Sequence, residues 1–414
     1  MRRVAVLLLL ALACRTAPPQ PVGPELAALA HPLTGDPADY DPLMRAIDGS
    51  HLVLLGEATH GTHEFYVERM RITQRLILEK QYTALAIEGD WEDAARVNRY
   101  VRGQSQDRSA EEALSGFTDF PRWMWRNREF VSLIEWIRQH NASLPPNALP
   151  VGVYGLDLYD VEASRAAVQR HLKNVDAALA ARVAKEKPKR QVELIRARAE
   201  HVSDVPTLDE LFSAEQNARV VRNGEEVKRA ESTGNVSPWN LRDRHMVETI
   251  DKLQRYLLRR QGHDDVIVWA HNSHVGDARA TGRARAGEWN MGQLVRTHWA
   301  PHASFTVGFM TNSGTVVAAH DWGGAPHVQQ LRTSMRGSHG AILHELGLPR
   351  FLLILGEVEA RPVRAPRLQR AVGVIYRPED EYASHYFQAT LREQFDAVIH
   401  IDETRALEPL EPIR

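Results

Sequence analysis

The chain has 414 residues, 43% of them hydrophobic and 25% charged, with a formal net charge of −2. This length indicates one large folded unit with a sizeable core rather than an array of small modules. The near-neutral charge gives no electrostatic basis for binding nucleic acid or an anionic membrane surface.

The N-terminus has the features of an export signal. Two arginines precede an apolar run over residues 4–13, which is too short to span a bilayer as a mature helix. Residues 11–13 fit the small-x-small rule of signal peptidase, whereas Cys14 resembles a lipobox cysteine that would carry a lipid anchor. We expect a leader over 1–14, a flexible Pro-rich tether over 15–38, and export to the periplasm or to the membrane of a bacterium as a lipoprotein.

Short apolar, β-rich runs recur along the rest of the chain. They lie at residues 52–55, 84–87, 151–154, 266–269, 304–309, 351–355 and 397–401. Turn or charged residues bound each run, and helical patterns separate most of them. This alternation predicts an α/β fold with a largely parallel central sheet flanked by helices.

Residues 161–260 carry no strand signal. They are rich in Ala, Arg, Lys and Glu at helical spacing, with a break near residues 234–238. We expect a helical insertion there, within a single domain over residues 39–414. It is either a mostly solvated helix pair or a lid over a cleft.

Four of the strand-like runs lead into chemically capable residues. Glu57 follows 52–55, Glu88 follows 84–87, Asp157 follows 151–154, and His271 and His274 follow 266–269. In open parallel sheets, ligands bind beyond the carboxyl ends of the strands. Any one of these side chains could simply cap its strand or the next helix. The combination of acids and imidazoles at four such ends predicts a site.

The turn after the first run supplies further candidates. Glycines on both sides permit tight backbone geometry, and the carboxylate of Glu57 can fix the tautomer and orientation of His60. Arg69 falls on the apolar face of the following helix, where a guanidinium is costly unless it is paired. Glu57 and Glu88 are its natural partners, and a purely structural ion pair is the alternative.

An aromatic cluster lies between the second and third runs. It consists of Phe117, Phe120, Trp123 and Trp125. These rings either form part of the core or line a broad apolar cleft suited to a bulky substrate.

Several common catalytic motifs are missing. Cys14 is the single cysteine, so the mature body has no disulfide, CxxC zinc site or thiol nucleophile. The sequence also has no Gly-x-Ser-x-Gly elbow, HExxH pair, Walker loop or GxGxxG loop. Serine-hydrolase, zinc-protease and nucleotide-dependent functions therefore lose their usual support.

Taken together, the motifs resemble those of the erythromycin esterase family. The resemblance rests on the order and spacing of short motifs from about residue 40 to the C-terminus. They are Gly56-Glu57-x-x-His60-Gly61, Glu64-Phe65, Arg69, Ile87-Glu88-Gly89, Trp123-Met124-Trp125, Asn240-Leu241-Arg242-Asp243, Trp269-Ala270-His271-Asn272-x-His274 and Met291-Gly292.

This resemblance implies a hydrolase that opens a macrolide lactone or a related carboxylic ester with water. It implies no covalent intermediate and no resident cofactor, and no metal ligand is assigned. The partner would be a small-molecule ester, with Trp123, Trp125, Phe117 and Asp157 as candidate substrate-binding residues. His63 and His339 match no functional position of the family.

The resemblance also implies roles for the polar residues. His60 would be the general base that takes a proton from the attacking water, while Glu57, Arg69 and Glu88 hold the base and the water. The imidazoles of His271 and His274 would polarise the carbonyl or protonate the leaving alkoxide. Ester hydrolysis needs such a base together with donors aimed at the developing oxyanion. Which imidazole is base and which is acid stays open at this point.

Two alternatives use the same residues. One is a metallohydrolase in which His60, His271 or His274 and the carboxylates hold a metal. The other is a non-catalytic periplasmic protein that binds a metal, haem or another ligand. The leader argues against a resistance role, because esterases that protect ribosomes are expected in the cytoplasm.

Overall fold

The computed structural model describes residues 24–234 and 236–413. The expected leader, Cys14 and the first part of the expected tether lie outside these residues. Within the described ranges, no helix has both the length and the apolar character needed to cross a membrane.

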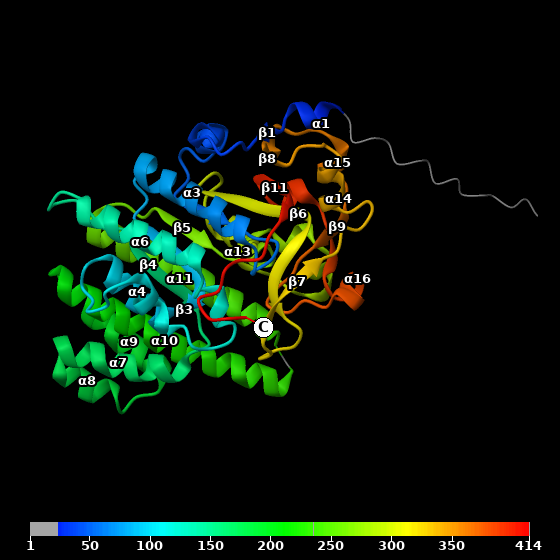
Figure 1. Ribbon diagram of the computed structural model, residues 1–414. Coiled ribbons are helices and arrows are strands. Elements are labelled where there is room, and N and C mark those ends of the chain that lie inside the picture. Colours follow the sequence, from blue (N-terminus) through cyan, green and yellow to red (C-terminus); the bar gives the residue numbers. More distant parts are fainter. Residues whose placement is uncertain (1–23, 235, 414) are drawn as a thin grey trace, which may run out of the picture.

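A single large sheet forms the centre of the molecule (Figure 1). Its strands follow the order β1-β8-β11-β6-β2-β5-β3-β4, and β7 pairs with β6. Every neighbouring pair from β11 to β4 is parallel, whereas β1–β8, β8–β11 and β6–β7 are antiparallel. The expected α/β fold with a largely parallel sheet is therefore confirmed. The strands are β1 (His31–Pro32), β2 (Leu52–Leu55), β3 (Ala84–Asp90), β4 (Gly152–Asp157), β5 (Val266–Trp269), β6 (Ser304–Ala319), β7 (Pro326–Leu331), β8 (Arg350–Ile354) and β11 (Ala397–Thr404).

The apolar strand sequences follow from burial on both faces of this sheet. In β2, Leu52 and Leu54 enter one buried cluster, while Val53 and Leu55 enter the other. Strands covered by helices on both sides need no alternation of apolar and polar residues. This is why the runs are continuous. A separate antiparallel pair, β9 (Arg367–Arg370) and β10 (Tyr386–Ala389), lies outside the main sheet.

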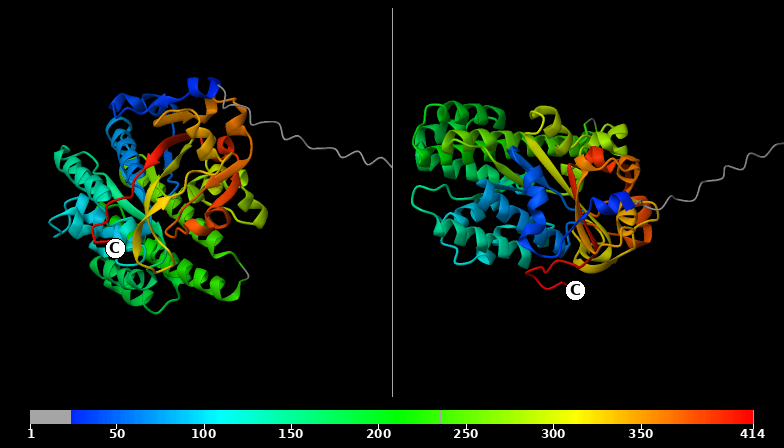
Figure 2. Two further views of the ribbon diagram at one scale, coloured as in Figure 1. Left: turned by 45° about the vertical axis from the view of Figure 1, so that its right-hand side comes forward. Right: turned by 90° about the horizontal axis from the view of Figure 1, so that it is seen from above.

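Helices cover both faces, as Figure 2 shows in the view from above. Side chains of α2, α3, α4 and α6 share one cluster with the sheet, and side chains of α7, α10, α11 and α13 share the other. The longer helices are α2 (Asp41–Ala46), α3 (His63–Lys80), α4 (Trp91–Val101), α6 (Arg128–Ser143), α7 (Val161–Val175), α8 (Ala177–Val183), α9 (Pro188–Ala199), α10 (Val205–Thr233), α11 (Pro238–Gln261), α13 (Met291–His298) and α14 (His339–His344). The short ones are α1 (Pro24–Ala28), α5 (Ala110–Ala113), α12 (Asn272–Val275), α15 (Arg361–Arg364), α16 (Glu381–Ser384) and α17 (Leu391–Gln394).

Helices α7 to α11 occupy the segment between β4 and β5. Helix α10 ends where Gly234 adopts a left-handed conformation, with φ at 65°, and α11 begins at Pro238. The buried side chains of α10 and α11 belong to the core beneath the sheet. The segment is thus a covering layer of the fold, and only the start of α11 reaches the pocket described below.

The expected tether over 15–38 is wrong from residue 24 onward. Leu26 and Leu33 are buried, and β1 pairs with β8 to form the edge of the sheet. The backbone N–H of Leu33 also donates to the carbonyl of Arg350 at 3.0 Å. The apolar side chains at these positions provide enough burial to hold this stretch against the domain.

Candidate active site

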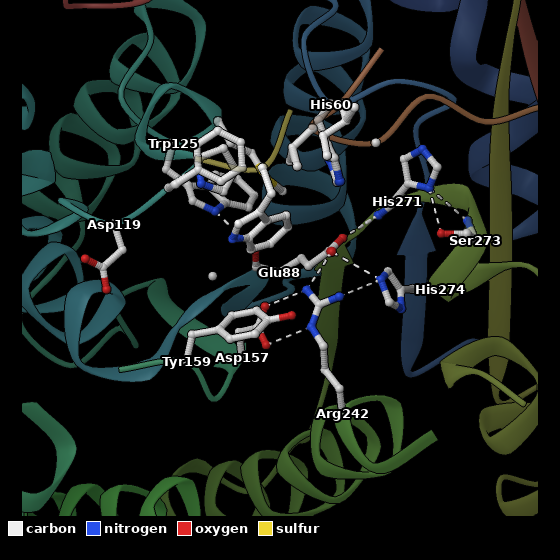
Figure 3. Close-up of a pocket in the computed structure, with 18 of the residues that line it drawn as sticks. His60, Glu88, Asp119, Trp125, Asp157, Tyr159, Arg242, His271, Ser273 and His274 are labelled. Carbon is white, nitrogen blue, oxygen red and sulfur yellow. Dashed lines mark hydrogen bonds and ion pairs between the residues drawn. The ribbon is translucent and has the colours of Figure 1, made fainter. Parts of the chain in front are cut away.

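The four strands that lead into capable residues lie side by side in the order β2-β5-β3-β4. Their carboxyl ends border a pocket of about 380 Å³, shown in Figure 3. Residues predicted from the sequence that line it are His60, Glu88, Phe117, Phe120, Trp125, Asp157, His271 and His274. Glu57, Arg69 and Trp123 are buried but are not among the lining residues.

His60 is held by a buried chain of charged groups. Its Nδ1 lies 2.7 Å from Oε1 of Glu57, and the other oxygen of Glu57 accepts a hydrogen bond from Nη2 of Arg69 at 2.5 Å. Beside them, Gly61 touches β6 so closely that a Cβ would lie 1.9 Å from the carbonyl oxygen of Val317. Only glycine fits this contact, and it fixes the turn that carries His60.

Arg69 is buried on the apolar face of α3, as expected from its position in the sequence. Its guanidinium lies 4.6 Å from the ring centre of Tyr66 and 4.4 Å from that of Trp269. The rings and Glu57 together compensate for the desolvation of this cation.

A second buried chain joins β3, β4 and α11. Arg242 donates from Nη2 to Oε1 of Glu88 at 2.8 Å, and its Nε and Nη2 donate to the two oxygens of Asp157 at 2.9 and 2.6 Å. Burial works against the charged form of Glu88, but His274 and Arg242 outweigh it and hold its pKa well below the ordinary value. Glu88 is therefore an anion at neutral pH.

His274 is enclosed between two carboxylates. Its Nδ1 lies 2.9 Å from Oδ2 of Asp243, and its Nε2 lies 3.2 Å from Oε1 of Glu88. The ring of Trp239 stacks on it, with centres 4.3 Å apart. Burial alone would lower the pKa of His274, but attraction to Asp243 and Glu88 raises it to about 9. Nη1 of Arg242 also lies 3.0 Å from Nε2, but the two carboxylates outweigh this cation, so His274 is an imidazolium at neutral pH with both ring nitrogens occupied.

His271 has the opposite electrostatic state. Burial and the neighbouring His60 hold its pKa well below the ordinary value, so its ring is neutral. The backbone N–H of Ser273 points at Nδ1 from 3.2 Å, so Nδ1 acts as the acceptor. A neutral ring with an accepting Nδ1 carries its proton on Nε2. That Nε2 is buried, and the backbone of Ala58 lies within hydrogen-bonding reach of the ring.

Further carboxyl groups line the pocket away from the imidazoles. Burial and the nearby Asp157 raise the pKa of Asp90 to about 8, and its carboxyl accepts backbone N–H groups of Tyr159 and Asp160 at 2.7 and 3.1 Å. Burial raises the pKa of Asp93 to about 7. Figure 3 shows Asp119 across the pocket from His271.

The two unassigned histidines lie elsewhere. Nδ1 of His63 is 2.5 Å from Oε1 of Glu129, and its Nε2 is 2.6 Å from Nη2 of Arg405. His339 is buried at the start of α14, where its Nε2 lies 2.8 Å from the carbonyl oxygen of Ala389. Neither residue lines the pocket.

The pocket does not meet the geometry of a simple metal centre. Among the described residues, only two groups of at least three His, Asp or Glu ligand atoms lie within 4.8 Å of one another. They are His51, Asp264 and Asp265 in one group, and His63, Glu129 and Glu408 in the other. No pocket residue belongs to either group.

Residues that sequence reasoning did not place in the site come from the start of α11. Arg242 bridges Glu88 and Asp157, Asp243 pairs with His274, and Trp239 stacks on His274. The short motif Asn240-Leu241-Arg242-Asp243 was the available signal, because it stands among the motifs of the resemblance. Its two charged residues had no apparent partner in the sequence.

Comparisons with solved structures support the fold described above. Solved structures with similar folds include a Bacillus cereus protein with a TM-score of 0.76, 21% sequence identity, and coverage of 94% of this chain and 98% of its own. A succinoglycan biosynthesis protein has a TM-score of 0.68 and 19% identity, covering 94% and 97%. A mutant of the erythromycin esterase EreC in its open conformation has a TM-score of 0.60 and 15% identity, covering 89% and 94%.

Similarity in sequence leads to the same group of proteins. The chain is 24% identical to an erythromycin esterase type II from Escherichia coli over 115 residues. These residues make up 28% of this chain and 26% of that relative. The match thus spans about a quarter of the relative. The model of the erythromycin esterase family matches residues 77–404, which is most of the chain. The chain therefore belongs to the erythromycin esterase family.

Proposed function

We propose that the protein hydrolyses a carboxylic ester or lactone by His60-assisted attack of water, without a covalent intermediate. The observation that carries this proposal is the pairing of two imidazoles at the pocket, with ring centres 4.8 Å apart and different proton positions. The carboxylate of Glu57 accepts a hydrogen bond from the Nδ1–H of His60, so Nε2 carries no proton and can act as a base. His271 presents an Nε2–H donor instead.

The reaction follows from these two nitrogens. His60 Nε2 takes a proton from water as the water oxygen bonds to the ester carbonyl carbon. The Nε2–H of His271 stabilises the oxyanion that forms on the carbonyl oxygen. The carbon–oxygen bond to the alcohol then breaks, and protonated His60 returns its proton to the leaving alkoxide. All atoms and protons are accounted for, with one water consumed.

The charged residues around the imidazoles hold this arrangement. Arg69 pairs with Glu57 and holds its carboxylate in place, and Glu57 then stabilises the imidazolium that forms on His60. Glu88 accepts the backbone N–H of His271 at 2.8 Å and fixes the loop that carries the donor. His274 supports Glu88 through its positive charge and takes no part in proton transfer, because both of its nitrogens are occupied.

Mass spectrometry of a 14-membered macrolide incubated with the protein in H₂¹⁸O tests the proposal. We expect a product heavier by one labelled water, with the label in the new carboxyl group. His60→Ala should abolish the product, and His63→Ala is the matched control because it removes a nearby histidine outside the pocket. Full turnover by His60→Ala would refute the role of the base. Loss of turnover on chelation would favour the metallohydrolase alternative.

A further inference from the structure

Two aromatic residues from distant parts of the chain meet at the pocket. Phe120 lies between α5 and α6, and Trp322 lies in the turn between β6 and β7. Their ring centres are 5.1 Å apart with an interplanar angle of 63°, an edge-to-face contact. Both residues line the pocket.

Trp322 borders solvent as well as the pocket. With 67% of its surface exposed, it is the most exposed large apolar side chain in the described part of the chain. Single exposed apolar side chains are common, whereas contiguous apolar surfaces mark ligand-binding grooves, and Trp322 is contiguous with Phe120 and the pocket. Because Trp322 is exposed, lines the pocket and contacts Phe120, it lies at the pocket mouth.

The mouth is separate from the reacting groups. Figure 3 shows Asp119, the chain neighbour of Phe120, across the pocket from His271. Phe117 and Trp125, whose ring centres are 6.4 Å apart, also line the pocket and extend the apolar wall inward from the mouth. A substrate whose carbonyl lies at the imidazoles therefore reaches the aromatic pair only if it carries a bulky apolar group.

We propose that Phe120 and Trp322 form an apolar lip that selects esters carrying a bulky apolar group. This inference rests on the proposed hydrolase function and adds its specificity determinant. The occupant is the apolar part of the substrate, since the lip is continuous with the pocket that binds the ester. The lip contributes binding energy and does not touch the reacting atoms.

The test compares two esters of the same acid, 2-naphthyl butyrate and methyl butyrate. For Trp322→Ala we expect the KM of the naphthyl ester to rise about tenfold, the loss expected when a modest apolar contact is removed. The KM of the methyl ester and kcat for both esters should stay near the wild-type values. Trp322→Phe should restore most of the affinity.

Val328→Ala is the matched control, because Val328 is 53% exposed on β7 of the same hairpin and does not line the pocket. An equal change in KM for both esters, or no change for either, would overturn the lip. Trp322 is exposed at a turn, so its replacement should leave the melting temperature unchanged.

A binding measurement separates this inference from the hydrolase proposal. The fluorescence of 2-naphthyl butyrate is titrated with His60→Ala, with and without Trp322→Ala. If the wild type binds this ester but hydrolyses neither substrate, the hydrolase proposal loses support for such esters. A higher Kd in the variant that also carries Trp322→Ala would still support the lip, and an unchanged Kd would overturn it.

Discussion

The rings of His60 and His271 lie 4.8 Å apart, yet their surroundings assign the ring protons to different nitrogens. A carboxylate of Glu57 faces Nδ1 of His60, whereas the backbone N–H of Ser273 faces Nδ1 of His271. Nε2 is therefore an acceptor in His60 and a donor in His271. Each ring state is set by its own neighbour, the Glu57 side chain for His60 and the Ser273 backbone N–H for His271.

Replacement of His60, the proposed base, is expected to slow catalysis strongly. For His60→Gln, kcat on any ester that the wild type hydrolyses should fall by about 10²–10⁴, because general-base assistance contributes that much. KM should change little, since the remaining lining residues stay in place. Steady-state kinetics on wild type, His60→Gln and His63→Gln provide the measurement. A similar loss in both variants would point to a general effect on folding instead of a role as base.

Replacement of His271, the proposed oxyanion donor, separates the effect of its hydrogen bond on kcat from the effect of its shape. His271→Phe should lower kcat by about 10²–10³, the cost of losing one oxyanion donor. His271→Gln retains an N–H donor and should recover part of that loss. Equal kcat values in the two variants would show that His271 does not stabilise the oxyanion.

Most of the sheet and one edge of the site were predictable because apolar runs and strand ends are local in sequence. The runs at 52–55 and 266–269 coincide with β2 and β5, and the acids and imidazoles after them meet at the pocket. The contribution of α11 was not predictable in this way. Arg242 contacts Asp157, 85 residues away, and that pairing depends on how an inserted helical layer packs onto the sheet.

Half-exposed elements were missed for a related reason. Strand β7 exposes half of its residues, and Trp322 lies in a turn of polar and glycine residues, so neither gives a period-two apolar pattern. Strand β6 also extends to Ala319, ten residues beyond the predicted end at 309, because it continues beside β11 to Gly314 and then pairs with β7. This second half is mostly buried, but polar residues and Gly314 interrupt its apolar pattern.

The buried pair behind His60 should matter for stability as well as activity. Arg69→Met leaves Glu57 buried with its charge unpaired, which should lower the free energy of unfolding by roughly 3–5 kcal/mol. The double variant Arg69→Met/Glu57→Gln removes both charges and should recover part of that loss. Urea unfolding at neutral pH measures both. Additive losses in the double variant would contradict a direct interaction between the two side chains.

The pKa of His274 predicts how stability changes with pH. An unfolded histidine titrates near its ordinary pKa of about 6.5, whereas the folded value is about 9. Because the folded state holds its proton more tightly, this contribution is fully present below about pH 6.5 and is lost as pH rises towards 9. It should amount to roughly 3 kcal/mol for this fully buried group.

The measurement is the free energy of unfolding by urea from pH 6 to pH 9.5 for wild type and His274→Gln. The wild type should lose stability across this range more steeply than the variant. His339→Gln is the matched control, because burial lowers the pKa of His339 to about 4 and the ring stays neutral throughout. It should keep the wild-type slope. A His274→Gln profile parallel to the wild type would mean that His274 is not the imidazolium between Asp243 and Glu88, and the anchoring of Glu88 would then need another source of charge.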